Sequence, residues 1–173
     1  MKTLTSLLSV AVWLCTFQCI AQNTAAANLS VQLNSIQSIR INPSQNEVSI
    51  ALNTASEYLN GKSASQPDHI EIMSSTNYEV KVSASSHLNG EAATIDVGTV
   101  TLTPSQGSIG GNSNGISLST TALSLADNTI VQSQQGDIKR TFNIEYHVSG
   151  GSEYLNKPVG TYTTLVTYTI LMP

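Results

Sequence analysis

Cysteine, tryptophan and charged residues are scarce in this chain, and each shortage excludes a class of protein. Both cysteines and the only tryptophan lie within the first 21 residues, at Cys15, Cys19 and Trp13. A chain that loses those residues has no thiol and no disulfide, which excludes thiol catalysis and a disulfide framework. Charged residues make up only 10% of the sequence, and 11 acidic residues outnumber 7 basic ones. Nucleic acids and anionic membrane surfaces bind basic patches, so neither is an expected partner.

Residues 1–21 have the layout of a secretory signal peptide. A short positive start precedes an apolar run, and Cys19 and Ala21 place small residues at the two positions that a signal peptidase reads. We therefore predict cleavage before Gln22 and a protein that is secreted, periplasmic or at the cell surface. Polar Thr16 and Gln18 interrupt the apolar run, and no second long run follows. No membrane span is expected after cleavage.

Apolar and polar residues alternate in many short segments of the remaining chain, as in half-buried strands. The apolar positions that alternate or cluster are Leu29, Val31 and Leu33; Ile36, Ile39 and Ile41; Val48, Ile50 and Leu52; Ile70 and Ile72; Tyr78, Val80 and Val82; Ile95 and Val97; Val100 and Leu102; Ile130 and Val131; Phe142, Ile144, Tyr146 and Val148; and Tyr162 to Met172. Eight or nine strands separated by turns predict an all-β antiparallel sandwich. We expect a flexible lead-in at residues 22–28 and one domain at 29–173.

Turn residues divide these segments, and no segment has a helix-length amphipathic stripe. Asn89-Gly90 predicts a hairpin turn, and the change of phase at Gly98 predicts a glycine bulge within a strand. Four glycines between Gly107 and Gly115 predict a flexible loop. Residues 116–125 fit either short strands or one helical turn.

One five-residue segment occurs twice, as Ser56–Asn60 and again as Ser152–Asn156. Each copy starts four residues after an apolar strand residue and leads into a loop. One interpretation is a pair of similar crossing loops, each with a tyrosine that caps the core and bonds the backbone through its hydroxyl. The other is a pair of matched ligand loops, whose binding residues are Tyr58, Asn60, Tyr154 and Asn156.

The residue types that catalyse reactions or bind metals do not cluster in the sequence. The histidines and the strand acids considered as candidates are His69, His87, His147, Glu71, Glu79 and Glu145. The histidines lack metal-ligand spacing, and the alternation predicts that the acids face solvent. Asp68-His69 is interpreted as a solvated pair at the start of a strand. No nucleophile elbow, phosphate loop or calcium loop occurs. We therefore expect no catalytic residue, metal or cofactor.

Both ends of the predicted domain favour assembly. The alternation of Leu29, Val31 and Leu33 is set off from the next strand by a break in phase. Such a segment can pair with its own sheet, or it can leave and complete a neighbour's sheet by strand addition. The long C-terminal strand is a pairing hazard unless something covers it. The equally weighted alternative to assembly is that both terminal segments are ordinary edge or core strands of a closed sandwich.

The segment Pro158-Val159-Gly160-Thr161-Tyr162 and the threonine-rich strand after it resemble the C-terminal ends of spore-coat-protein-U-type and related pilin-like secreted bacterial proteins. The leader that ends in Ala-Gln resembles those of small exported proteins of Bacteroidetes-type bacteria. The resemblance covers about the last 15 residues, and the chain lacks the disulfide cysteines of the coat-protein-U pilins. It implies an immunoglobulin-like sandwich that polymerises through N-terminal donor strands into surface fibres, with Leu29, Val31 and Leu33 as the strand-exchange residues.

These observations favour a non-enzymatic, exported structural or adhesion subunit of the cell surface, with itself or other surface subunits as partners. The alternative is a carbohydrate- or peptidoglycan-binding module that uses Tyr58 and Tyr154 as stacking platforms for sugar rings. The partner would then be a cell-wall or surface glycan. A metal-free hydrolase is a third hypothesis, and it requires acids that converge in one cleft.

Overall fold

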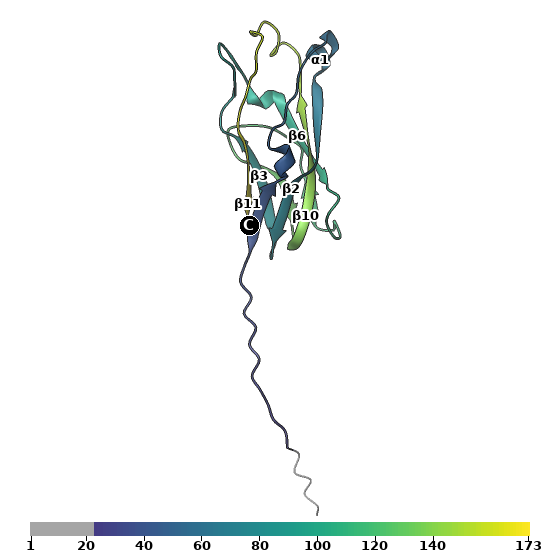
Figure 1. The fold of residues 1–173 in the computed structure, drawn as a ribbon, viewed down its shortest axis with the longest axis vertical. Helices are drawn as coiled ribbons and strands as arrows, with labels where there is room; N and C mark the ends of the chain where they lie inside the picture. Colours follow the sequence, from purple (N-terminus) through teal and green to yellow (C-terminus); the bar gives the residue numbers. More distant parts are fainter. Residues whose placement is uncertain (1–22) are drawn as a thin grey trace, which may run out of the picture. The chain divides into compact units, whose positions relative to one another are not determined.

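The computed structural model describes residues 23–173, and the chain divides into two units, residues 1–33 and 34–173. In the first unit, residues 23–33 have no regular secondary structure and all are exposed, so the strand expected at Leu29–Leu33 is absent. The second unit is an antiparallel β-sandwich, as the alternation predicts (Figure 1). No helix within 23–173 has the length and apolar character needed to cross a bilayer.

Two sheets of five and four strands form the sandwich, with the orders β1-β2-β10-β6-β8 and β11-β3-β9-β7. A small hairpin, β4-β5, is separate. The elements are β1 (Gln37–Ile41), η1 (Pro43–Gln45), α1 (Ala55–Asn60), β2 (Lys62–Ser74), β3 (Tyr78–Ala84), β4 (Leu88–Asn89), β5 (Thr94–Ile95), η2 (Val97–Thr99), β6 (Val100–Gln106), β7 (Ile116–Leu118), β8 (Thr121–Ala122), β9 (Asn128–Ser133), β10 (Asp137–Val148) and β11 (Val166–Leu171).

The core lies between the two sheets and is built from the inward positions of the alternating strands. In β3, for example, Tyr78, Val80, Val82 and Ala84 are buried and the residues between them are half-exposed. In β10, Phe142, Ile144, Tyr146 and Val148 are buried in the same way. Each fully buried large apolar side chain contributes about 1.5–3 kcal/mol to folding. The hydrophobic effect therefore sets both the register and the inward face of each strand.

Three local predictions are wrong. Residues 55–60 form a short helix, because Thr54 and Glu57 make a reciprocal capping box at its start. The phase change at Gly98 is a 3₁₀ turn, η2, and not a bulge; the Asp96 side chain accepts a hydrogen bond from the Gly98 amide. Val48, Ile50 and Leu52 do alternate in burial, yet residues 47–53 join no sheet.

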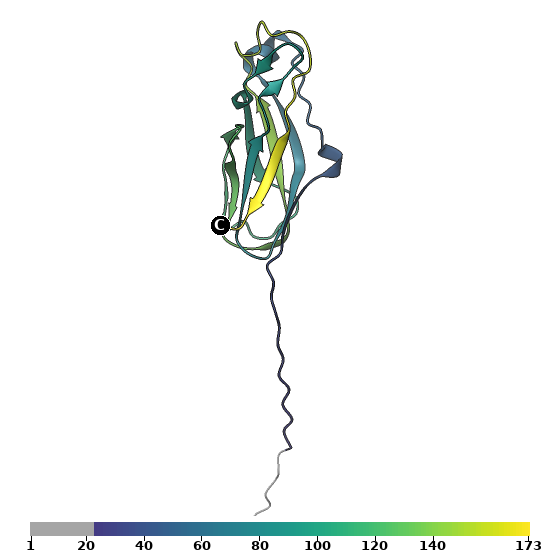
Figure 2. The ribbon, with the colours of Figure 1, turned by 90° about the vertical axis from the view of Figure 1, so that its left-hand side faces the viewer.

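The two ends of the sandwich are made of different elements. One end, here called the base, contains the start of β1 and the turns 74–77 and 133–137, because Gln37 and Asp137 both pair with Ser74. The other end, here called the α1 end, contains α1 and the loop 149–165 (Figure 2). β11 starts at the α1 end and finishes near the base, where Leu171 pairs with Glu79.

A buried ion pair closes the base. Arg140 is 2% exposed, and its Nε lies 2.9 Å from Asp137 Oδ2 but off the direction of a hydrogen bond. The Tyr78 hydroxyl donates to the same carboxylate oxygen at 2.9 Å. Arg140 Nη2 also donates to the Asn112 carbonyl at 2.9 Å, which ties the glycine-rich loop to the core.

We expect Asp137→Asn to lower the free energy of unfolding by about 3–5 kcal/mol, because a buried guanidinium loses its counter-charge while the shape is kept. Urea denaturation at pH 7 measures this. The matched control is the double variant D137N/R140M, which has no buried charge and should be more stable than D137N. R140M alone completes the comparison. If the loss of unfolding free energy in D137N/R140M equalled the sum of the losses in D137N and in R140M, the two charges would not be coupled.

Candidate functional site

The fold brings the two copies of the repeated segment together at the α1 end. The Gly151 amide, just before the second copy, donates to the Tyr58 carbonyl in the first copy at 2.7 Å. Gly150 has a φ of +68°, and a Cβ there would lie 2.8 Å from the Tyr58 carbonyl oxygen. Only glycine allows this approach, so the contact between the copies is specified by backbone geometry.

The two copies adopt different local structures despite their identical sequence. The first copy forms most of α1, and the second forms a series of turns in which Leu155 donates its amide to the Ser152 carbonyl at 3.2 Å. The first copy has Thr54 as an N-cap, whereas the second follows Gly150 and Gly151, both with positive φ. Flanking residues therefore decide the conformation of each copy.

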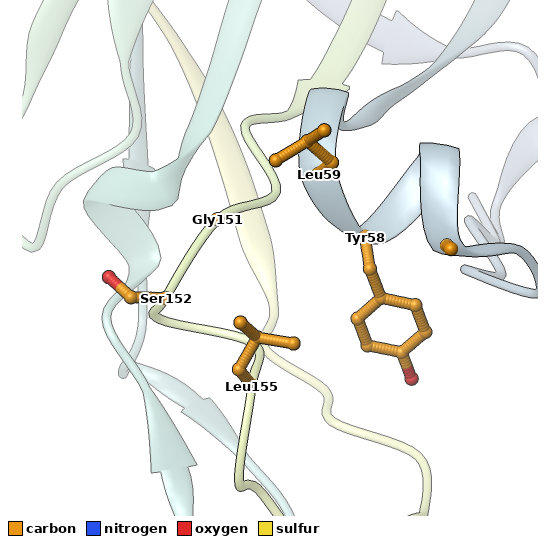
Figure 3. Close-up of a pocket in the computed structure, with 6 residues that line it drawn as sticks. Tyr58, Leu59, Gly151, Ser152 and Leu155 are labelled. Atoms are coloured by element: carbon orange, nitrogen blue, oxygen red, sulfur yellow. The ribbon is translucent and has the colours of Figure 1, made fainter.

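An open hollow of about 600 Å³ lies between the copies. Its lining is almost wholly apolar and consists of Ala55, Tyr58, Leu59, Gly151, Ser152 and Leu155. Figure 3 shows the side chains of Tyr58, Leu59 and Leu155 around the open space, while the Ser152 hydroxyl points away from them. Leu59 is 73% exposed and Leu155 is 52% exposed. The sequence repeat marked these two segments, but the two leucines were not among the candidate residues.

The four predicted ligand-loop residues do not form one surface. Tyr58 lines the hollow, whereas Tyr154 is half-buried against the core and its hydroxyl lies 2.6 Å from that of Thr99. Burial raises the pKa of the Tyr154 hydroxyl. Asn60 bonds Ser56 at 3.2 Å within α1, and Asn156 takes a left-handed turn position with φ +59°. Tyr154 thus caps the core, as one interpretation predicts, but bonds a side chain rather than the backbone.

A second notable region lies along the flank shown in Figure 2, which has β11 in front and the segment after η1 to its right. Within the described part of the chain, the backbone amides of residues 46–52 have no hydrogen-bond partner. β11 is an edge strand that pairs on one side only, with β3. Both edges carry half-buried apolar rows packed against the core: Val48, Ile50 and Leu52, and Val166, Tyr168 and Ile170.

A buried polar network connects these two edges. His69 Nδ1 lies 3.0 Å from Gln45 Oε1, next to the unpaired segment, and His69 Nε2 lies 2.9 Å from the Tyr146 hydroxyl. That hydroxyl lies 2.6 Å from the hydroxyl of Tyr168 on β11. The His69 and Tyr168 rings meet edge to face, with centroids 5.8 Å apart. Residues 45 and 168 therefore lie on two sides of the same imidazole.

The prediction that His69 is solvated is wrong, because β2 contains a bulge. Asp68 has a φ of +49°, and the register with β10 shifts between the Phe142–Ile70 and Ile144–Gln66 pairs. The extra residues on β2 turn His69 inward beside Ile70, so that both are buried. The Asp68 carboxylate holds the bulge by accepting from Ser108 and Thr141, at 2.6 Å from each hydroxyl.

The three residues predicted for strand exchange lie in the first unit and are exposed. Leu29, Val31 and Leu33 are 90%, 73% and 90% exposed. Their side chains occupy alternate positions of a segment without regular structure.

The residues considered for catalysis or metal binding are dispersed. Glu71 pairs with Arg40 and Lys139, and Glu79 contacts Gln132 and Lys81. Glu145 and His147 both contact Ser63 on the outer face, and His87 accepts a hydrogen bond from the Val97 amide. Within residues 23–173, no group of three histidine, cysteine or acidic side chains could hold a metal ion.

Comparison with protein-family models gives no match, and no curated protein matches the chain either. Any functional inference therefore depends on the residues and the geometry described above.

The buried histidine makes the stability depend on pH. Burial lowers the pKa of His69 from 6.5 to about 4. A histidine with a depressed folded pKa stabilises fully above its unfolded pKa, and that contribution is lost as the pH falls from about 6.5 towards 4. We expect His69→Gln, which removes the titrating group, to flatten this dependence. The wild type should lose roughly 3 kcal/mol more than H69Q between pH 7 and 4.

Urea midpoints at pH 7, 6, 5 and 4 measure the difference. The interval from pH 6.5 to 5 lies above the ordinary pKa values of the carboxylates with lowered pKa, 4.5 for Glu57 and 3.8 for Asp68. The difference between the two profiles isolates His69, because both proteins contain His87 and His147. Parallel pH profiles for the two proteins would show that His69 is not the titrating group.

Proposed function

We propose that this protein is an exported, non-enzymatic subunit of a cell-surface assembly, of pilin-like or adhesion type, built by strand addition. Residues 29–33 of one copy lie between β11 and residues 47–53 of the next copy and complete its sandwich. The single observation that carries the proposal is that two apolar edges on one flank, residues 46–52 and the outer side of β11, lack strand partners within the described chain. The resemblance to pilin-like secreted proteins and the predicted leader agree with this assignment.

The backbone explains why this flank would accept a strand. Buried or half-buried amides need partners, and an edge strand with a free backbone edge is a template for another chain. The other edge strand of the second sheet is β7, with three residues, and the edge strands of the first sheet are β8 and β1, with two and five. β11 has six residues and an apolar row, so it is the better template.

The donor segment has the complementary pattern. Leu29, Val31 and Leu33 would project from one face of an added strand, in the same spacing as Val166, Tyr168 and Ile170 of β11. Burying each of these three side chains would contribute about 1.5–3 kcal/mol before the cost of ordering the segment. The backbone of residues 46–52 would gain hydrogen-bond partners in the same step.

Carbohydrate or peptidoglycan binding receives less support. Sugar recognition needs polar groups beside an aromatic face, and the hollow at Tyr58 is lined almost wholly by apolar atoms. Tyr154 is partly buried against the core instead of lying beside Tyr58.

We expect the exported chain to form oligomers whose size increases with concentration, and the variant L29D/V31D/L33D to be monomeric. The carboxylates would have to be buried against the apolar rows, which is unfavourable by several kcal/mol. Sedimentation velocity at several concentrations measures the distribution of masses.

The control variant N28D/S30D/Q32D adds the same charge on the alternate face of the segment and should still assemble. Equal assembly of both variants would contradict strand addition by residues 29–33. A wild type that is monomeric at every concentration would contradict the assembly itself, and a lower melting temperature of only L29D/V31D/L33D would then show that the segment completes its own sandwich.

A further inference from the structure

We infer that the apolar hollow at the α1 end is the surface that receives the base of the neighbouring copy of this chain. The inference rests on the proposed function, because the direction of the added strand places the neighbour. Every strand pair within residues 23–173 is antiparallel. β11 is the regular strand of the two edges, so a strand added beside it by the same pairing runs opposite to β11, and it runs parallel to residues 46–52, which lead from η1 to α1.

The path of β11 then fixes where the donor segment emerges. β11 runs from the α1 end, where Val166 pairs with Ala84, to the base, where Leu171 pairs with Glu79. An antiparallel donor runs from the base of the receiving copy towards its α1 end. Leu33, at the carboxyl end of the donor, consequently lies at the α1 end of the receiving copy.

The short connection brings the next domain against that end. Only Asn34, Ser35 and Ile36 separate Leu33 from the first residue of β1. Four Cα–Cα steps span at most roughly 14 Å, so the base of the donor copy cannot lie far from the α1 end of the receiving copy. β1 begins at the base, next to the turn 74–77.

The two surfaces that this arrangement brings together are both apolar. The base presents Ile36, Met73 and Ile138, which are 59%, 41% and 87% exposed. The α1 end presents Leu59 and Leu155 around the hollow, which is about 600 Å³ in volume and open to solvent (Figure 3). Exposed apolar patches of this kind mark interaction surfaces, and the proposed strand addition brings the start of the neighbour's β1, with the rest of its base, to this place.

The hollow also offers almost no polar surface to a small polar ligand. The Ser152 hydroxyl points away from the opening, and the Gly151 amide is already bonded to the Tyr58 carbonyl. An isoleucine or methionine side chain fits such a lining, whereas a sugar would leave its hydroxyls without partners. The occupant is therefore a second copy of this chain.

The test is a disulfide cross-link between two single-cysteine variants of the exported chain, L155C and I138C. The sequence has no cysteine after Cys19, so the introduced thiols are the only ones in the exported chain if the predicted leader is removed. We expect a cross-linked heterodimer when the two variants are mixed and oxidised under assembling conditions. Neither variant alone should cross-link to itself, because a head-to-tail contact brings residue 155 of one copy near residue 138 of the next.

A second variant measures the energetic contribution. L155D places a charge at the hollow and should weaken the association roughly tenfold or more, as expected for the loss of one buried leucine contact. T103D adds the same charge on the exposed face of β6 and should assemble like the wild type. Both sites are exposed, so folding is checked by circular dichroism and is expected to be unchanged.

The outcomes separate the two proposals. Assembly that depends on residues 29–33 but gives no L155C–I138C cross-link and no effect of L155D overturns the docking surface and leaves strand addition standing. Cross-linking of L155C to itself would show that two α1 ends meet, and this result would also overturn the docking surface. A chain that remains monomeric overturns the proposed function and this inference together.

Discussion

The ladder between β2 and β10 is the constraint on which the rest of the sandwich depends. These are the two longest strands, and together they provide Ile70, Ile72, Phe142, Ile144, Tyr146 and Val148 to the core. The bulge at Asp68 interrupts their register and is held by hydroxyls of Ser108 and Thr141. It turns His69 into the interior, where the imidazole can meet Gln45 on one side and Tyr146 on the other. One local irregularity thus organises the contacts between η1, β10 and β11.

The incomplete pairing of one flank is the feature that connects fold with function. A closed sandwich satisfies its backbone amides within its own sheets, whereas residues 46–52 and the outer edge of β11 lack strand partners within the described chain. Half-buried apolar side chains line both edges, so the cost of leaving them open is partly hydrophobic and partly one of unmade hydrogen bonds. An added strand would relieve both costs together, which is the physical argument for our proposal of assembly.

The candidate sites differ in how far the sequence could have predicted them. The repeat of Ser56–Asn60 at Ser152–Asn156 marked two segments that the fold does bring together, although the lining leucines, Leu59 and Leu155, were missed. Their adjacency depends on Gly150 and on the Gly151 amide, a contact across about ninety residues that no local pattern encodes. The burial of His69 was missed because Asp68-His69 was interpreted as a solvated pair at the start of a strand, whereas the pair lies within β2 and a bulge turns His69 inward.

The sequence by itself determined the all-β class, most strand positions and the inward face of strands such as Tyr78–Ala84, because a two-residue apolar period is a local property of the chain. It also marked the glycine-rich loop and the hairpin at Asn89-Gly90. Only the tertiary structure decided which strands pair, that Val48, Ile50 and Leu52 stay outside both sheets, and that Tyr154 turns towards the core. Those outcomes depend on pairing and burial between residues far apart in the chain, where many partners satisfy the same local pattern and packing selects one.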